Sequence, residues 1–221
     1  MSDMDQNDQP NETPSTFQSA VRAAIGLGLF AILTAGLVAL VQTNTSERIA
    51  EQEKKARLAA LYALVPESLR SNDLLADSYV LSYQGVEREV FLAKKDARTT
   101  SLIFPWTAPD GYTAPIELLI AVGIDGELIG VRVLTHKETP GLGDKIELSK
   151  SDWILSFNEK SLSNTDTEAW NVKKDGGEFD QLTGATITPR AIVLAVYDAL
   201  TFFETHQDQL LSQAPKSKLS L

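Results

Sequence analysis

The stretch FDQLTGATITPR (residues 179–190) places a hydroxyl-rich turn directly before a predicted helix. Thr188 is a candidate N-cap for that helix, and Pro189 suits the first helical position, where the backbone needs no N–H. The small residues before Thr186 leave the backbone open to close approach. The Thr186 hydroxyl is then expected beside the positive end of a helix dipole, which favours phosphate. An ordinary capped turn has the same composition, so the stretch alone indicates a phosphate site without establishing one.

Helical and extended patterns flank this turn. Residues 189–204 carry apolar side chains at helical spacing, and two apolar runs, 116–123 and 127–134, lie on either side of Asp125-Gly126. A type I′ turn, with positive φ at both central residues, suits that dipeptide, so the runs predict a β-hairpin. A succession of strands with helices at its ends predicts an α+β domain. Further strands are predicted at 79–83, 89–93 and 100–104, and a short helix at 149–158.

Composition excludes several kinds of protein and site. The net charge of −10 argues against nucleic acid as a partner, because a phosphate backbone attracts Lys and Arg. The absence of cysteine excludes disulfides, Cys-ligated iron–sulfur clusters and cysteinyl flavin. Only His136 and His206 could serve as histidine ligands, and no catalytic set or metal site is predicted. Any electron carrier built on this chain is therefore expected to be organic.

The first part of the chain has the composition of a membrane anchor. Residues 20–41 are apolar except for Arg22 and Thr34, which matches the ~20 residues needed to cross a bilayer. A cleaved signal peptide is the alternative, but the preceding segment is long and acidic rather than short and basic. The predicted parts are a disordered tail (1–19), a transmembrane helix (20–42), a helical stalk (43–70), a globular domain (71–208) and a flexible tail (209–221).

A second candidate segment is THKETPGLGDKIE, residues 135–147. Its Pro-Gly-Leu-Gly loop can present backbone N–H groups, which suit the edge of a ligand on which negative charge develops. A solvated turn with a charge cluster is the simpler interpretation of this segment alone. Together, however, the Thr-Gly-Ala-Thr core and the Glu-Thr-Pro-Gly-Leu-Gly segment resemble two motifs of the FMN-binding domain family. That domain occurs in the G subunit of Rnf (Rsx) electron-transport complexes and in the C subunit of sodium-pumping NADH:quinone reductases.

The resemblance implies a cofactor and a set of site residues. In the family, FMN is joined through its phosphate to the last threonine of the Thr-Gly-Ala-Thr motif, which is Thr186 here. A flavin transferase is thought to read the acidic position upstream, here Asp180. By the same resemblance, Lys145 would contact either the polar edge or the ribityl side of the flavin. The phosphate end would be held by Thr183, Gly184, Ala185 and Thr186, and the isoalloxazine would be bordered by Glu138, Thr139, Gly141, Leu142 and Gly143.

The resemblance also implies a location and partners. It predicts a single-pass protein of the bacterial inner membrane, with the bilayer and the other membrane subunits of the complex as partners and the domain on the periplasmic side. Basic residues after the apolar span, Arg48 and Lys54 among them, would by charge count alone keep the domain in the cytoplasm. Two alternatives stay open: a quinone-reductase C-type subunit, and a flavin-free periplasmic sensor or scaffold in which Thr186 is only a turn residue.

Overall fold

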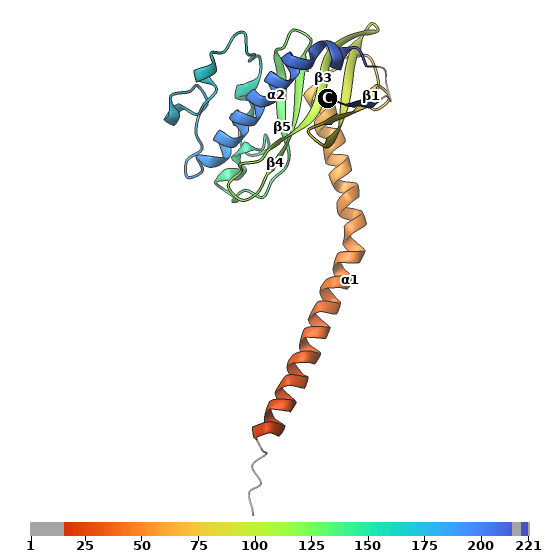
Figure 1. Ribbon diagram of the computed structural model, residues 1–221, viewed down its shortest axis with the longest axis vertical. Coiled ribbons are helices and arrows are strands. Elements are labelled where there is room, and N and C mark those ends of the chain that lie inside the picture. Colours follow the sequence, from red (N-terminus) through yellow and green to blue (C-terminus); the bar gives the residue numbers. More distant parts are fainter. Residues whose placement is uncertain (1–15, 214–217, 221) are drawn as a thin grey trace, which may run out of the picture. The chain divides into compact units, whose positions relative to one another are not determined.

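The computed structural model describes residues 16–213 and 218–220 (Figure 1). Its first element is one continuous helix, α1 (Thr16–Leu64). The helix begins four residues earlier than predicted, so residues 16–19 are helical rather than disordered; the rest of the predicted tail lies outside the described residues. It ends at Leu64, as expected from Pro66, which cannot continue a helix, so residues 65–70 of the predicted stalk are not helical. Among the described helices, α1 alone is long and apolar enough to cross a membrane.

The chain divides into two compact units, with the boundary after Lys54. The last turns of α1 therefore belong to the second unit, which begins earlier than the predicted domain start at residue 71. The second unit contains a six-stranded sheet of order β5-β4-β3-β2-β1-β6. Its strands are β1 (Ser78–Tyr83), β2 (Val86–Lys95), β3 (Arg98–Ala108), β4 (Ile116–Gly123), β5 (Leu128–Thr135) and β6 (Lys218–Ser220). Consecutive strands β1 to β5 pair antiparallel, which confirms the predicted α+β class.

The described part of the C-terminal region differs from the prediction of a flexible tail; residues 214–217 and 221 lie outside the described residues. The last helix, α2 (Ile187–Leu211), continues several residues past the predicted end at residue 204. Residues 218–220 then form β6, which pairs parallel with β1 at the edge of the sheet. Polar composition suggested fraying, but an edge strand needs only backbone groups to pair, and these do not depend on side-chain polarity.

The hairpin between β4 and β5 is confirmed, although its turn is of another type. Gly126 has a φ of +84°, whereas Asp125 is not among the residues with positive φ. Gly126 N–H donates to the Gly123 carbonyl at 2.9 Å, and Gly123 N–H donates to the Glu127 carbonyl at 2.8 Å. These bonds describe a three-residue loop with glycine in the left-handed position rather than a type I′ turn. Asp125 is a turn residue, as predicted, and its Oδ1 accepts from Glu127 N–H at 3.2 Å.

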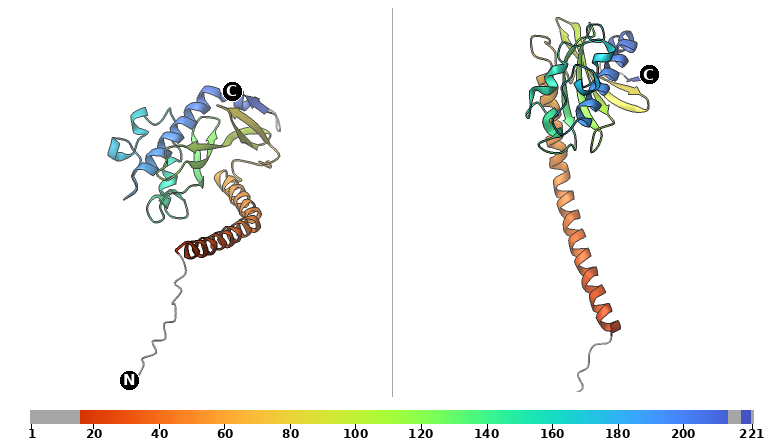
Figure 2. Two further views of the ribbon diagram at one scale, coloured as in Figure 1. Left: turned by 60° about the horizontal axis from the view of Figure 1, so that its bottom comes forward. Right: turned by 90° about the vertical axis from the view of Figure 1, so that its left-hand side faces the viewer.

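The two faces of the sheet are covered by different helices. α2, drawn in blue in Figures 1 and 2, lies across one face and buries the apolar residues that its spacing predicted. Against the opposite face, the end of α1 buries Leu61 and Leu64. All three tryptophans belong to the α2 side of the core. The α2 residues predicted to be buried, and found so, are Ile192, Val196, Ala199, Leu200 and Phe203.

An irregular segment connects β5 to α2. It contains four short 3₁₀ helices: η1 (Gly143–Ile146), η2 (Asp152–Phe157), η3 (Thr167–Ala169) and η4 (Lys173–Asp175). The second of these replaces the predicted helix at 149–158, and its Trp153, Ile154 and Phe157 are buried as expected. Phe157 stacks on Phe179 with ring centroids 4.6 Å apart. This stack anchors the chain just before the turn that leads into α2.

Candidate functional site

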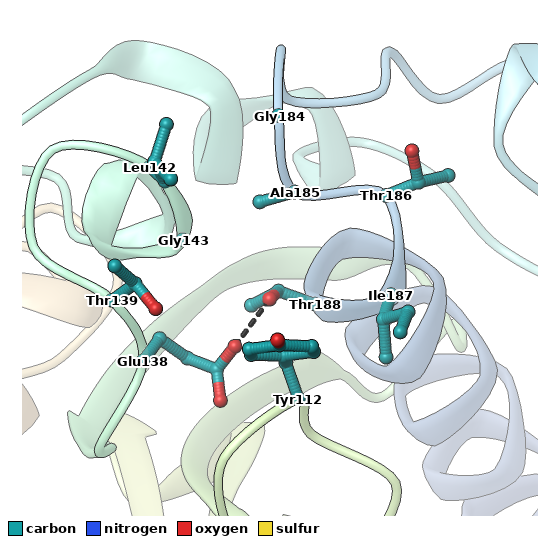
Figure 3. A pocket seen from close by; sticks show the side chains of 10 residues that line it. All are labelled: Tyr112, Glu138, Thr139, Leu142, Gly143, Gly184, Ala185, Thr186, Ile187 and Thr188. Carbon is teal, nitrogen blue, oxygen red and sulfur yellow. Dashed lines mark hydrogen bonds between the residues drawn. The ribbon is translucent and has the colours of Figure 1, made fainter.

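A pocket of about 340 Å³ lies where the N-terminus of α2 meets the loop that follows β5 (Figure 3). Three segments form its wall: the turn and first residues of α2, the loop at 138–143, and the loop before β4. Most of the residues that the sequence assigned to a cofactor site are therefore brought together. The lining residues are Tyr112, Glu138, Thr139, Leu142, Gly143, Gly184, Ala185, Thr186, Ile187 and Thr188.

A tight turn carries the chain into the pocket. Ala185 N–H donates to the Leu182 carbonyl at 3.0 Å, which closes a four-residue β-turn. Gly184 occupies its third position with a φ of +82°, as a type II turn requires. A Cβ at Gly184 would lie 3.0 Å from Leu142 Cδ2, so the glycine also allows the turn to approach the facing loop. Glycine is therefore needed here for both conformation and space.

The prediction that Thr188 caps α2 is wrong, and neither threonine at the start of the helix makes a capping hydrogen bond. Thr188 is not the N-cap: it is the second residue of the helix, is buried, and its hydroxyl donates to Glu138 Oε2. Thr186 directly precedes the helix, but its backbone already has helical angles and its side chain makes no capping hydrogen bond. A capping side chain normally requires an extended backbone, which explains the difference. In Figure 3 the Thr188 hydroxyl points toward Glu138, whereas the Thr186 hydroxyl points away from it.

Glu138 connects all three segments of the wall. Its side chain is buried, and the residue is 4 % exposed. Oε1 accepts from the backbone N–H of Thr113, at 3.0 Å, and Oε2 accepts from the Thr188 hydroxyl. The Glu138 N–H donates to Nδ1 of His136 at 3.1 Å, and His136 Nε2 lies 2.9 Å from Glu147 Oε1. His136 thus orients the loop through hydrogen bonds to protein groups.

The loop at 138–143 is closed by its own backbone. The N–H groups of Leu142 and Gly143 both donate to the Thr139 carbonyl, at 3.2 and 3.0 Å. The Gly143 N–H is consequently not the open donor that the Gly-Leu-Gly sequence suggested. A Cβ at Gly143 would lie 2.9 Å from Glu138 Cβ and 3.2 Å from Thr188 Oγ1, so this glycine permits the Glu138–Thr188 contact.

Four predicted site residues do not line the pocket. Gly141 has a φ of +79° and open space around it, and Thr183 is exposed on the turn. The Lys145 carbonyl accepts from Ser151 Oγ at 2.6 Å, on the side of η1. The Asp180 side chain is 71 % exposed and lies 2.6 Å from Lys173 Nζ. Asp180 is thus available on the surface, close in sequence to the turn but outside the cavity.

Three lining residues were not assigned to the site by sequence reasoning. Tyr112 and Ile187 are exposed large side chains, and Thr188 was assigned to capping. Tyr112 precedes β4 in a loop without a recognisable motif, so no sequence signal identifies it. Ile187 could have been identified from the sequence, because it is an apolar residue between two threonines in a turn that was expected to be solvated.

The chemistry of the lining suits a ligand with an apolar body and an anionic end. Leu142, Ile187 and the Tyr112 ring offer apolar surface to a ligand in the pocket. The first N–H groups of α2 have no acceptor within the helix and suit a phosphate. The three tryptophans are buried elsewhere in the core and do not line the pocket.

Comparisons with known proteins give matches in both the N-terminal and the C-terminal part of the chain. A family model described as the FMN-binding domain matches residues 111–201, and one described as the RnfG N-terminal region matches residues 8–64. The G subunit of the ion-translocating oxidoreductase complex of Pseudomonas aeruginosa (strain UCBPP-PA14) is 47 % identical over 204 residues, covering 90 % of this chain and 95 % of the relative.

The G subunits of two further organisms are also similar over most of their length. That of Shewanella oneidensis is 43 % identical, with 87 % of this chain and 93 % of the relative covered. That of Vibrio vulnificus is 42 % identical, with 85 % and 90 % covered. Because identity of this level covers most of the chain, including both the long N-terminal helix and the domain, the chain belongs to the family of G subunits of the ion-translocating oxidoreductase (Rnf) complexes.

Proposed function

We propose that this protein is a membrane-anchored electron carrier whose FMN is esterified through its phosphate to Thr186. The observation that carries the proposal is the position of the Thr186 hydroxyl, at the rim of the pocket, beside the start of α2 and free of any capping bond. The Thr188 hydroxyl, two residues away, is buried and bound to Glu138, which leaves Thr186 as the better acceptor of a phosphoryl group.

The pocket residues have distinct roles in this proposal. The helix N-terminus and the turn at Gly184 hold the phosphate end, since they combine free N–H groups with an uncovered backbone. Leu142, Ile187 and Tyr112 exclude water from the flat face of the ring. When bound, FMN supplies the one- and two-electron chemistry that these side chains lack. A covalent link prevents loss of the cofactor into a compartment without free FMN.

The apolar part of α1 supports a membrane location. We infer a single pass through the bacterial inner membrane, contacts with the other membrane subunits of the complex, and a domain on the periplasmic side. Domains of this length can be translocated despite basic residues after the span. A flavin transferase is the inferred maturation partner, with the exposed Asp180 as part of its recognition site.

Intact mass of the denatured full-length chain, produced together with a flavin transferase, tests the proposal. We expect an increment of one FMN less one water and a fluorescent band after denaturing electrophoresis. Thr186→Ala should remove both signals. Thr201→Ala is the matched control, because Thr201 is an exposed threonine further along α2 whose hydroxyl donates to the Tyr197 carbonyl.

If the unsubstituted chain carries no added mass under these conditions, the alternative of a flavin-free domain is favoured. If Thr186→Ala retains the added mass, attachment through Thr186 is wrong.

A further inference from the structure

The Glu138 carboxylate is a buried charge without a basic partner among the described residues. No ion pair of that part of the chain involves it; its two partners are neutral donors, the Thr113 N–H and the Thr188 hydroxyl. This carboxylate lies in the wall of the pocket, where burial weakens the screening of its charge by water.

Such a charge acts on any neighbouring group that gains electrons. Reduction of a flavin adds negative charge at the pyrimidine edge of its ring, and a like charge nearby opposes that change. At an effective dielectric constant of about 20, a unit charge even ~10 Å away shifts an equilibrium by roughly tenfold or more.

We propose that the Glu138 carboxylate lowers the reduction potential of the flavin held in this pocket and so makes the subunit a stronger electron donor. The inference rests on the proposed function, because it requires flavin in the cavity. It assigns to Glu138 an electrostatic role distinct from its structural role in connecting the wall segments.

The substitution Glu138→Gln separates these two roles. The amide oxygen can accept from the Thr113 N–H, and the amide NH₂ can donate to the Thr188 hydroxyl, which accepts as readily as it donates. The hydrogen-bonded frame is therefore retained while the charge is removed. Glu147→Gln is the matched control, since Glu147 is bonded to His136 at the other end of the same hydrogen-bond chain and lies outside the pocket.

The measurement is a redox titration of the flavin-loaded full-length chain in detergent, followed by flavin absorbance. At a fixed applied potential we expect the ratio of reduced to oxidised flavin to rise about tenfold in Glu138→Gln, which corresponds to about 30 mV for a two-electron couple. Glu147→Gln should change that ratio by less than about threefold. The thermal unfolding midpoint of each variant, measured in parallel, shows whether the hydrogen bonds of residue 138 to Thr113 and Thr188 are retained.

The outcomes separate this inference from the function on which it rests. A loaded Glu138→Gln chain whose ratio stays within about twofold of the unsubstituted protein overturns the inference and leaves the carrier proposal intact. A folded Glu138→Gln chain that takes up no flavin, while Glu147→Gln does, also overturns it, because the carboxylate then serves attachment. Absence of flavin from the unsubstituted chain removes the proposed function itself. A Glu138→Gln chain that unfolds overturns the premise that the amide can replace the carboxylate in the frame.

Discussion

The loop that contains Glu138 and the segment that contains Asp180 are built in opposite ways. Glu138 is buried, accepts two hydrogen bonds from neutral groups, and joins three parts of the chain. Asp180 is exposed and pairs with the long side chain of Lys173. The difference teaches that one carboxylate shapes the pocket, whereas the other is presented to whatever approaches from solution. Substitutions in the two regions should therefore affect different properties.

The largest expected effect is that of Glu138→Leu. Two buried donors, the Thr113 N–H and the Thr188 hydroxyl, would lose their acceptor, and each unsatisfied donor costs about 1–3 kcal/mol. We expect the free energy of unfolding to fall by about 3 kcal/mol in a urea titration followed by circular dichroism. A loss smaller than about 1 kcal/mol would show that the carboxylate does not hold the wall together. Glu147→Leu provides the comparison, because the Glu147 side chain, which is bonded to His136, is partly exposed and can be replaced without burying an unsatisfied donor.

Two glycines of the same loop give an intermediate effect and test whether contact or conformation matters more. Gly143→Ala introduces a Cβ 2.9 Å from Glu138 Cβ, so we expect a cost of about 2 kcal/mol from overpacking. Gly141→Ala meets no atom within 4 Å but has a φ of +79°, so the cost is backbone strain alone, about 1 kcal/mol. The same urea titration measures both. If Gly143→Ala lowers the free energy of unfolding no more than Gly141→Ala does, the loop has room for an added methyl group beside Glu138 and Thr188, and the contact is less tightly packed than described.

The smallest effect on stability is expected for Asp180→Ala. An exposed ion pair contributes less than about 1 kcal/mol, so the urea midpoint should change little. Flavin attachment, measured as the fraction of chains with the added mass, should nevertheless fall. Asp175→Ala is the control, because Asp175 also forms an ion pair near the start of α2, with Arg190 at 2.6 Å. Normal attachment in Asp180→Ala would argue against recognition through this carboxylate, and reduced attachment in both variants would argue against its specificity.

Local patterns in the sequence predicted much of the fold. The Asp125-Gly126 hairpin, the apolar face of α2 and the long apolar helix all follow from spacing and composition within one element. The type of the hairpin turn did not follow, because Asp-Gly is compatible with more than one loop that places glycine in the left-handed region. The edge strand β6 was missed because its pairing depends on β1, far away in the sequence.

The candidate site was predictable to a similar degree. Two motifs identified both sides of the pocket, but not the bond that joins them. Thr188 looks like a helix cap when only its neighbours are considered, and its actual partner, Glu138, is 50 positions away. Tyr112 enters the wall from a third segment without a motif of its own. Such long-range pairings are decided by packing of the whole domain, which no local pattern encodes.

The indole of Trp153 ties the turn to the rest of the domain in a way that has a practical use. Its Nε1–H donates to the Asp180 carbonyl at 2.6 Å, and the ring itself packs on Phe157. The chain therefore carries an intrinsic chromophore bonded to the backbone of the segment that bears Thr186. With the proposed flavin attached, light absorbed by this ring would pass to it by energy transfer, so a dimming of the tryptophan emission of the purified chain, relative to Thr186→Ala, would give a label-free gauge of maturation.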